Sequence, residues 1–267
     1  MYYCCGITEK GLPPHNEDAM MMHHTVLTEG EQQIGIEEPF MAAVCDGVSG
    51  EQAGELASQT CLNLLSGVHY GKSLNLKRQI LDIHSQIAAS GKLLETTANM
   101  QTTLCGIAID ETNALHCFNV GDSRLYRFRN GTLEQISRDQ TLVQMLYDEG
   151  TITSEQKMVH THRHIVLPVI GNLDAEPKPE VVIYPDGLRL GDMLLLCTDG
   201  LTDYVSIYEI EEILAAPRPL PKRLHELTDA ALGNGGKDNI TMIAVQRYPD
   251  EIPIPGIQIL YEREPIN

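Results

Sequence analysis

The sequence is short of positive charge, and this shortage excludes some classes of partner. Its 267 residues include 19 Lys and Arg against 37 Asp and Glu, so the formal net charge is −18. We do not expect a chain this acidic to bind nucleic acid or an anionic membrane surface. We interpret most of the excess negative charge as surface charge that favours solubility, and a smaller part as carboxylates that line a cation site.

The chain also lacks the patterns that mark secreted and membrane proteins. Its seven Cys form no Cys-x-x-Cys pair and no regular spacing, so a disulfide framework is not expected. The first residues contain neither the basic nor the apolar region of a signal peptide. No apolar run approaches the roughly 20 residues that span a bilayer. We therefore expect a cytoplasmic protein.

Motifs for several other kinds of phosphate and metal chemistry are missing from the sequence. A Cys-based phosphatase needs Cys-x5-Arg, and the nearest pair, Cys117 and Arg124, is one residue too far apart. The segment from Gly67 to Ser73 is one residue too short for a P-loop and follows a predicted helix. Acidic residues are not spaced as in an EF-hand.

The apolar pattern alternates between strand and helix character and predicts an α+β sandwich. Neighbouring strands joined by short turns indicate antiparallel sheets, and the helices are grouped rather than one per strand. A Pro-rich tail over 248–267 follows a domain over 1–247, and we expect this tail to be extended on the surface. Strands are predicted at 40–45, 103–109, 114–120, 124–129, 132–136, 181–184, 193–198 and 240–246, and helices at 51–65, 74–89, 141–149, 154–159, 207–214 and 220–232.

Four Asp residues lie beside Gly or Asn at the ends of apolar runs: Asp46, Asp122, Asp199 and Asp238. A further acidic pair occurs in Asn-Glu-Asp at 16–18. Any single Asp-Gly is more typical of a turn than of a ligand. However, three of the four adjoin runs too apolar for a surface edge, and a buried carboxylate needs a cation or hydrogen-bond donors. Carboxylates at strand ends suit Mg²⁺ or Mn²⁺, so the set predicts a metal site.

The order of these motifs resembles that of the PPM/PP2C family of metal-dependent Ser/Thr protein phosphatases, in its bacterial form. The resemblance extends from about residue 3 to 247 and implies a central sandwich of two antiparallel β-sheets flanked by helices on both sides. The matching segments are 16–19, 44–50, 100–104, 119–126, 138–143, 195–203 and 237–241.

The resemblance implies a site for two Mn²⁺ or Mg²⁺ ions. Asp46 would bridge the two ions, and Asp199 and Asp238 would bind one of them. Glu17 and the carbonyl of Gly47 would serve the other ion, partly through water. Asp46, Asp199 and Asp238 are therefore the expected catalytic residues, acting through a hydroxide held between the ions. Metal ions assist the hydrolysis of phosphate esters in general, because they lower the pKa of bound water and neutralise the phosphoryl oxygens.

The resemblance also implies further residues of this site and the substrate of the enzyme. Asp18 would lie behind the ligands, and Asp122, with Asp199 and Asp203, would form a third, weaker metal position. The implied reaction is the hydrolysis of phosphoserine and phosphothreonine on proteins phosphorylated by a Ser/Thr kinase. We expect the enzyme to act as a monomer.

The N-terminal motif departs from the family pattern. Family members usually carry an Arg that grips the substrate phosphate shortly before Asn-Glu-Asp, but Pro13 and Pro14 occupy this stretch. Losing such a charge-assisted contact weakens phosphate binding by about ten- to a hundredfold, which predicts a raised KM. Lys10 and His15 are candidates for a partial replacement. Val48 stands where eukaryotic members often carry His, as is common in bacterial members.

Residues 145–171 correspond to the variable flap that lies beside the active site in this family. The segment contains His160, His162 and His164, and such alternation is more often a solvated face than a metal site. His160 is the one that matches a family position, and we assign it a modest role in substrate docking.

A non-catalytic regulator with the same fold is the alternative interpretation. It would bind a phosphoprotein or a metal without turnover, and Pro13 in place of Arg is its best support. The complete set of clustered Asp residues argues against it, because their mutual repulsion has little purpose without catalysis.

Overall fold

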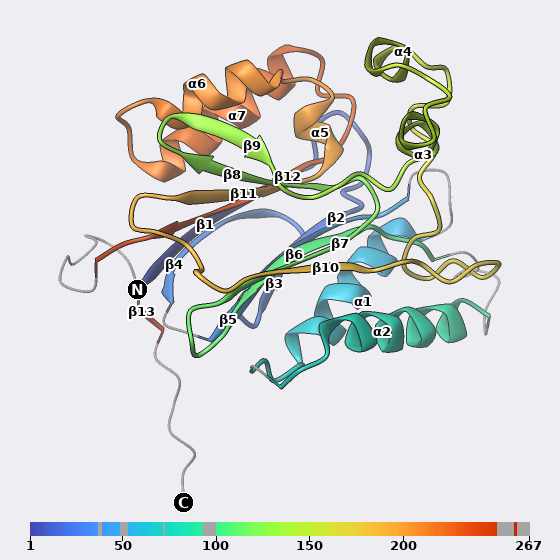
Figure 1. Ribbon diagram of the computed structural model, residues 1–267, viewed down its shortest axis with the longest axis horizontal. Helices are drawn as coiled ribbons and strands as arrows, with labels where there is room; N and C mark the ends of the chain where they lie inside the picture. The colour runs from blue at the N-terminus through green and yellow to red at the C-terminus, as the bar shows by residue number, and fades with distance from the viewer. Residues whose placement is uncertain (37–38, 49–52, 72, 93–99, 250–258, 261–267) are drawn as a thin grey trace, which may run out of the picture.

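The core of the protein is a sandwich of two β-sheets, with a layer of helices on each outer face (Figure 1). The computed structural model describes residues 1–36, 39–48, 53–71, 73–92, 100–249 and 259–260. The expected α+β sandwich of two sheets with helices on both sides is therefore confirmed.

One sheet has seven strands and the other has six. All strand pairs are antiparallel except β13 with β4. The seven-stranded sheet has the order β13 (Ile259–Leu260), β4 (Gly30–Ile36), β1 (Tyr2–Glu9), β12 (Ile240–Arg247), β11 (Met193–Cys197), β8 (Arg124–Arg129) and β9 (Thr132–Gln135). The six-stranded sheet has the order β10 (Glu180–Tyr184), β7 (Leu115–Val120), β6 (Leu104–Ile109), β5 (Phe40–Asp46), β2 (Asp18–Met22) and β3 (Thr25–Leu27).

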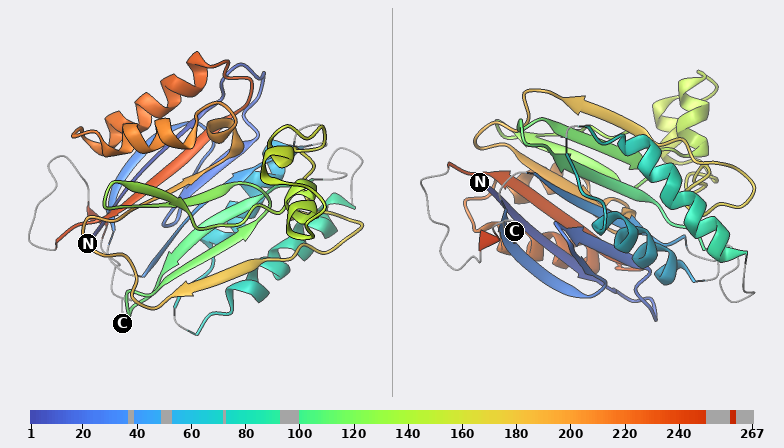
Figure 2. Two further views of the ribbon diagram at one scale, coloured as in Figure 1. Left: turned by 45° about the horizontal axis from the view of Figure 1, so that its top comes forward. Right: turned by 90° about the horizontal axis from the view of Figure 1, so that it is seen from below.

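The longer helices form the two outer layers, and the views in Figure 2 show that each pair lies along its sheet. Helices α1 (Gly54–Ser66) and α2 (Leu76–Gly91) cover the six-stranded sheet, while α6 (Ile207–Ala215) and α7 (Leu220–Gly233) cover the seven-stranded sheet. Three short helices lie near one end of the sandwich: α3 (Leu142–Asp148), α4 (Ser154–Met158) and α5 (Asp199–Thr202).

Polar side chains set where several of these helices begin. The Asn75 side chain accepts a hydrogen bond from the Arg78 amide at the start of α2. Thr153 and Gln156 form a reciprocal capping box at α4. Such caps satisfy amides that have no partner within the helix.

The central strands are buried on both faces, which explains their continuous apolar sequences. In β12, Ile243 and Val245 pack between the two sheets, whereas Met242 and Ala244 pack beneath α6 and α7. Successive side chains of a strand point to opposite faces, so a strand covered on both sides must be apolar at every position.

Four strands near the N-terminus, β1 to β4, were not predicted. β1 pairs with β4 and β12 over its whole length, and β2 pairs with β5. β1 contains Tyr2, Tyr3, Cys4 and Cys5, all buried, and such a run without alternation resembles no single periodic pattern.

The predicted tail over 248–267 lies largely outside the described residues. Its domain boundary stays a prediction, although β12 ends at Arg247. Within the described part of the chain, no helix is both long enough and apolar enough to cross a membrane.

Gly106 in β6 provides a test of the packing between β6 and β7. A Cβ atom at this position would lie 2.2 Å from Cζ of the buried Phe118 and 3.0 Å from Cβ of Ala43. We expect Gly106→Ala to lower the free energy of unfolding by about 1–3 kcal/mol, because the ring must move within a close-packed core. Urea denaturation measures this change.

Gly233→Ala is the matched control, because a Cβ atom there has no neighbour within 4 Å and the position ends α7. This variant should be as stable as the wild type or slightly more stable. Equal stability of the Gly106→Ala variant and the wild type would contradict the packing described here.

Candidate metal centre

Four of the predicted carboxylates come from strand ends at one edge of the sandwich. Asp18 begins β2 and lies directly opposite Asp46, the last residue of β5. Asp199 begins α5 immediately after β11, and Asp238 precedes β12 by two residues. Each sheet therefore contributes two of these carboxylates, and their charges act on one another.

A chain of hydroxyl hydrogen bonds joins the two sheets beneath this cluster. The Thr198 hydroxyl donates to Oδ2 of Asp18 at 2.8 Å, and the Thr241 amide donates to the same hydroxyl oxygen at 3.1 Å. All three residues are buried. Asp18 is therefore held by the opposite sheet, and its place behind the metal ligands stays a prediction.

Hydrogen bonds from two Thr residues fix the backbone of Asp46. Its amide donates to the Thr103 hydroxyl at 3.0 Å, and its carbonyl accepts from the Thr103 amide and the Thr102 hydroxyl at 2.8 and 2.9 Å. These bonds use the main chain of Asp46 and set the direction in which its carboxylate leaves the strand.

Gly47 is required by the close approach of three segments. Its amide donates to the Glu17 carbonyl at 3.1 Å. A Cβ atom at Gly47 would lie 2.5 Å from the carbonyl of Gly54, the first residue of α1. Only a residue without a side chain brings Glu17, Gly47 and the start of α1 together in this way.

Asn239 ties the N-terminal loop to the carboxylate cluster, and its role was not anticipated from the sequence. Its side-chain amide donates to the carbonyls of Lys10 and His15 at 2.7 and 3.0 Å, and its side-chain oxygen accepts from the Glu17 amide at 2.8 Å. The position follows Asp238 in a motif that was recognised, but these partners lie more than 200 residues away in the sequence.

The carboxylates repel one another strongly. Burial raises the pKa of Asp18 to about 7, with further increases from Asp238 and Glu17, against hydrogen bonds from Thr241 and Thr198. Burial and the charges of neighbouring Asp residues raise the pKa of Asp46 and Asp199 well above their usual range.

The donor set fits hard divalent cations. In the described part of the chain, neither Asp46, Asp199 nor Asp238 forms an ion pair with Lys or Arg. Clustered carboxylate oxygens without such partners are the donors that Mg²⁺ and Mn²⁺ prefer, and a bound cation would remove their mutual repulsion.

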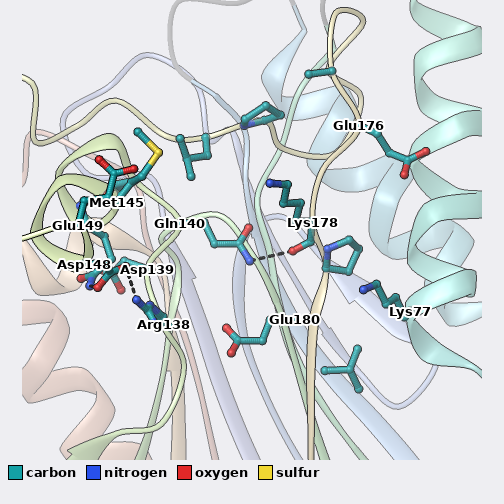
Figure 3. Close-up of a pocket in the computed structure, with 17 residues that line it drawn as sticks. Lys77, Arg138, Asp139, Gln140, Met145, Asp148, Glu149, Glu176, Lys178 and Glu180 are labelled. Carbon is teal, nitrogen blue, oxygen red and sulfur yellow. Dashed lines mark hydrogen bonds and ion pairs between the residues drawn. The ribbon is translucent and has the colours of Figure 1, made fainter.

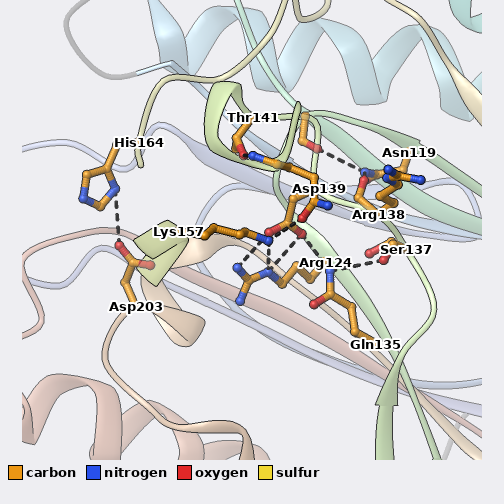
Figure 4. A network of polar contacts seen from close by, with 12 residues as sticks. Asn119, Arg124, Gln135, Ser137, Arg138, Asp139, Thr141, Lys157, His164 and Asp203 are labelled. Carbon is orange, nitrogen blue, oxygen red and sulfur yellow. Dashed lines mark hydrogen bonds and ion pairs between the residues drawn. The ribbon is translucent and has the colours of Figure 1, made fainter. Parts of the chain in front are cut away.

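A second group of ligand atoms lies next to this cluster. One ligand atom each from Asp199, Asp203 and His164 lies within 4.8 Å of the others, and Nδ1 of His164 is 3.6 Å from Oδ2 of Asp203 (Figure 4). Asp122 lines the same cavity. Asp122, Asp199 and Asp203 are the residues predicted for the third metal position, and His164 is an addition that the sequence did not indicate.

A buried ion pair supports the wall beside Asp122. Nε and Nη2 of Arg124 both donate to the buried carboxylate of Asp139, at distances of 2.9–3.2 Å (Figure 4). Gln135 also donates to this carboxylate at 2.7 Å. Arg124 and Asp139 lie in segments that were recognised as motifs, but their pairing is visible only in the fold.

The residues predicted to contact substrate lie in two places. Lys10 and His15 belong to the N-terminal loop that Asn239 holds beside the cluster. His160 packs near His162, with ring centroids 5.6 Å apart, and its Nδ1 accepts from the His162 amide. His164, rather than His160, is the member of this series that reaches an acidic residue of the site. The docking role of His160 stays a prediction.

The crowding of carboxylates predicts an inverse dependence of stability on pH in the metal-free protein. A carboxyl whose pKa is raised by folding binds protons more readily in the folded state, so stability falls as pH rises through the raised pKa. We expect the Tm in excess chelator to fall from pH 6 to pH 8. Asp46→Asn should raise the Tm at pH 8 and weaken this dependence.

Asp229→Asn, on the exposed face of α7, is the control and should follow the wild type. Thermal unfolding at pH 6, 7 and 8 separates the variants. An Asp46→Asn variant that is less stable than the wild type at pH 8 without metal would contradict the repulsion.

Comparisons with known proteins identify similar sequences. A sequence model of the protein phosphatase 2C family matches residues 31–235 of the chain. A serine/threonine phosphatase of Listeria welshimeri is 34% identical over 234 residues, which cover 84% of this chain and 91% of that protein. The serine/threonine protein phosphatase PstP of Mycobacterium tuberculosis is 36% identical over 208 residues, which cover 76% of this chain and 39% of that protein.

Solved structures of bacterial phosphatases have the same fold. The catalytic domain of PstP in complex with two manganese ions matches with a TM-score of 0.72 and 31% identity, over 92% of this chain and 99% of that one. A serine/threonine phosphatase from Staphylococcus aureus matches with a TM-score of 0.80 and 29% identity, over 93% and 96% of the two chains.

Proposed function

The chain belongs to the protein phosphatase 2C family, and we propose that it uses divalent cations to hydrolyse phosphoserine and phosphothreonine on proteins. The observation that supports this proposal most strongly is the meeting of Asp46, Asp199 and Asp238 at the junction of the two sheets. No observation favours the non-catalytic alternative, and the similar proteins are named as phosphatases.

Two Mn²⁺ or Mg²⁺ ions would be held by carboxylates from both sheets. Asp46, Asp199 and Asp238 would hold the ions together with Glu17 and the Gly47 carbonyl. The hydrogen bond from the Gly47 amide to the Glu17 carbonyl keeps these last two residues side by side. Asp122 and Asp203, with His164 nearby, would serve a third position.

When bound, such ions acidify a water molecule and neutralise the phosphoryl oxygens during attack on phosphorus. The residues of the chain hold the carboxylates in place. The Thr103 and Thr102 bonds hold Asp46, and the Thr198 hydroxyl holds Asp18, so the carboxylates need little rearrangement on binding. Preorganised charge of this kind contributes most to catalysis of reactions that develop negative charge.

Residues 1–247 are proposed as the catalytic domain, with 248–267 as an appended tail. The proposed substrates are proteins phosphorylated by a Ser/Thr kinase in the cytoplasm, and the proposed active form is the monomer. The acidic net charge of −18 is consistent with protein substrates rather than nucleic acid.

Hydrolysis of p-nitrophenyl phosphate in the presence of Mn²⁺, Mg²⁺ or EDTA tests the reaction. We expect metal-dependent turnover in the wild type and no turnover in EDTA. Asp46→Asn and Asp199→Asn should each lower kcat by about a thousandfold, because losing a metal ligand removes several kcal/mol of transition-state stabilisation.

Asp229→Asn is again the control and should retain wild-type turnover, since it lies on the exposed face of α7. Circular dichroism confirms that each variant is folded. A folded wild type that binds Mn²⁺ and hydrolyses neither this ester nor phosphopeptides would refute the proposed activity.

A further inference from the structure

A second cavity opens beside the candidate metal centre. It has a volume of about 900 Å³ and lies between α3 and the segment 175–181 that leads into β10 (Figure 3). Met145, Leu167, Pro168 and Val181 provide an apolar lining. A cavity of this size and character is typical of binding sites rather than of packing defects.

This cavity, a groove along α3, adjoins the cavity that contains the carboxylates. The carboxylate cavity has a volume of about 520 Å³ and is lined by Asp122, Asp199 and Asp203. Asp139 and Thr141 line both cavities. Both residues are buried and held, Asp139 by Arg124 and Thr141 as the cap of α3, so the boundary shared by the two cavities is a fixed part of the fold.

One methionine side chain lines each of the two cavities. Met145 of α3 lines the groove, and Met158 at the end of α4 lines the carboxylate cavity. They are 38% and 72% exposed, respectively, although both are apolar. Exposed Met is characteristic of surfaces that adapt to peptides of varied sequence, because the side chain is unbranched and flexible.

The charges in the groove are not all compensated within the protein. Arg138 pairs with Asp148, and Arg124 pairs with Asp139. Glu149, Glu176 and Glu180 also line the groove and form no ion pair with another residue that the structure describes, although the charge of Glu180 acts on Arg138; the Lys residues of the lining are Lys77 and Lys178. The groove therefore has a small excess of negative charge, and Glu149 and Glu180 lie on elements that form its two walls.

We propose that this groove binds the extended polypeptide on one side of the phosphorylated Ser or Thr of the substrate. An apolar side chain of the substrate packs near Met145, and a basic side chain lies close to Glu149 and Glu180. The inference rests on the proposed phosphatase function, because the groove lies directly beside the cavity of the candidate metal carboxylates and shares Asp139 and Thr141 with it. It adds a sequence preference to that function.

Phosphopeptides of matched length test the preference. The set carries one phosphothreonine, with two Arg, two Ala or two Glu placed either before or after it. We expect kcat/KM of the wild type to be about five- to twentyfold higher for one of the two Arg peptides than for its Glu counterpart, since two exposed charge pairs contribute on this scale.

The double variant Glu149→Lys and Glu180→Lys should abolish or invert this preference. Its turnover of p-nitrophenyl phosphate should stay at the wild-type level, because this ester has no peptide to occupy the groove. Glu29→Lys with Glu212→Lys is the control: both residues are exposed outside the groove, and the change in net charge is identical.

The docking groove and the phosphatase activity are refuted by different results. Equal kcat/KM for Arg and Glu peptides, or an unchanged preference in the groove variant, would refute the docking groove and leave the cavity to another occupant. So would a wild type that hydrolyses p-nitrophenyl phosphate but no peptide. Absence of metal-dependent turnover of p-nitrophenyl phosphate in the wild type would instead refute the proposed function.

Discussion

The structure depends on holding several carboxylates together where the two sheets meet. Asp18 and Asp46 belong to one sheet, while Asp199 and Asp238 follow strands of the other. Their repulsion is unfavourable for folding by itself, so the surrounding hydrogen bonds must oppose it. The Thr198 hydroxyl and the Asn239 side chain oppose the repulsion from the seven-stranded sheet and its loops. They also fix the position of one sheet relative to the other at this edge.

The two-sided burial of the central strands supplies the rigidity that this edge needs. β12 packs against the other sheet on one face and against α6 and α7 on the other, and β5 is covered in the same way by α1 and α2. A strand in this environment cannot shift its register without exposing or clashing apolar side chains on both faces. The strand ends, and with them the carboxylates, are therefore fixed by packing far from the site.

Local patterns in the sequence predicted most of the strands, the long helices and the main carboxylates, because Asp-Gly and Asp-Asn motifs mark strand ends directly. They did not predict β1, since a strand buried on both faces shows no alternation. Nor did they predict the roles of Asn239 and His164. Asn239 bonds to residues more than 200 positions away, and His164 is distinguished from His160 and His162 only by the way the segment after α4 turns toward Asp203. Long-range contacts of this kind leave no local signature.

The same geometry determines which basic side chains lie near the carboxylate cluster. Gly11 has a φ of 68°, and a side chain there would clash with the Asp238 carbonyl, so the N-terminal loop passes close to the cluster with Pro13 rather than Arg. The carboxylate cavity is instead lined by Arg124, Lys157, Arg163 and His164. Because Arg124 is bound to Asp139, the basic Lys and Arg side chains of this cavity outside that ion pair are Lys157 and Arg163. In the sequence both lie between α3 and residues 167–168, which line the groove. The proposed phosphate contacts and the proposed docking groove would therefore belong to the same part of the chain, whereas the candidate metal ligands come from the ends of the sheet strands.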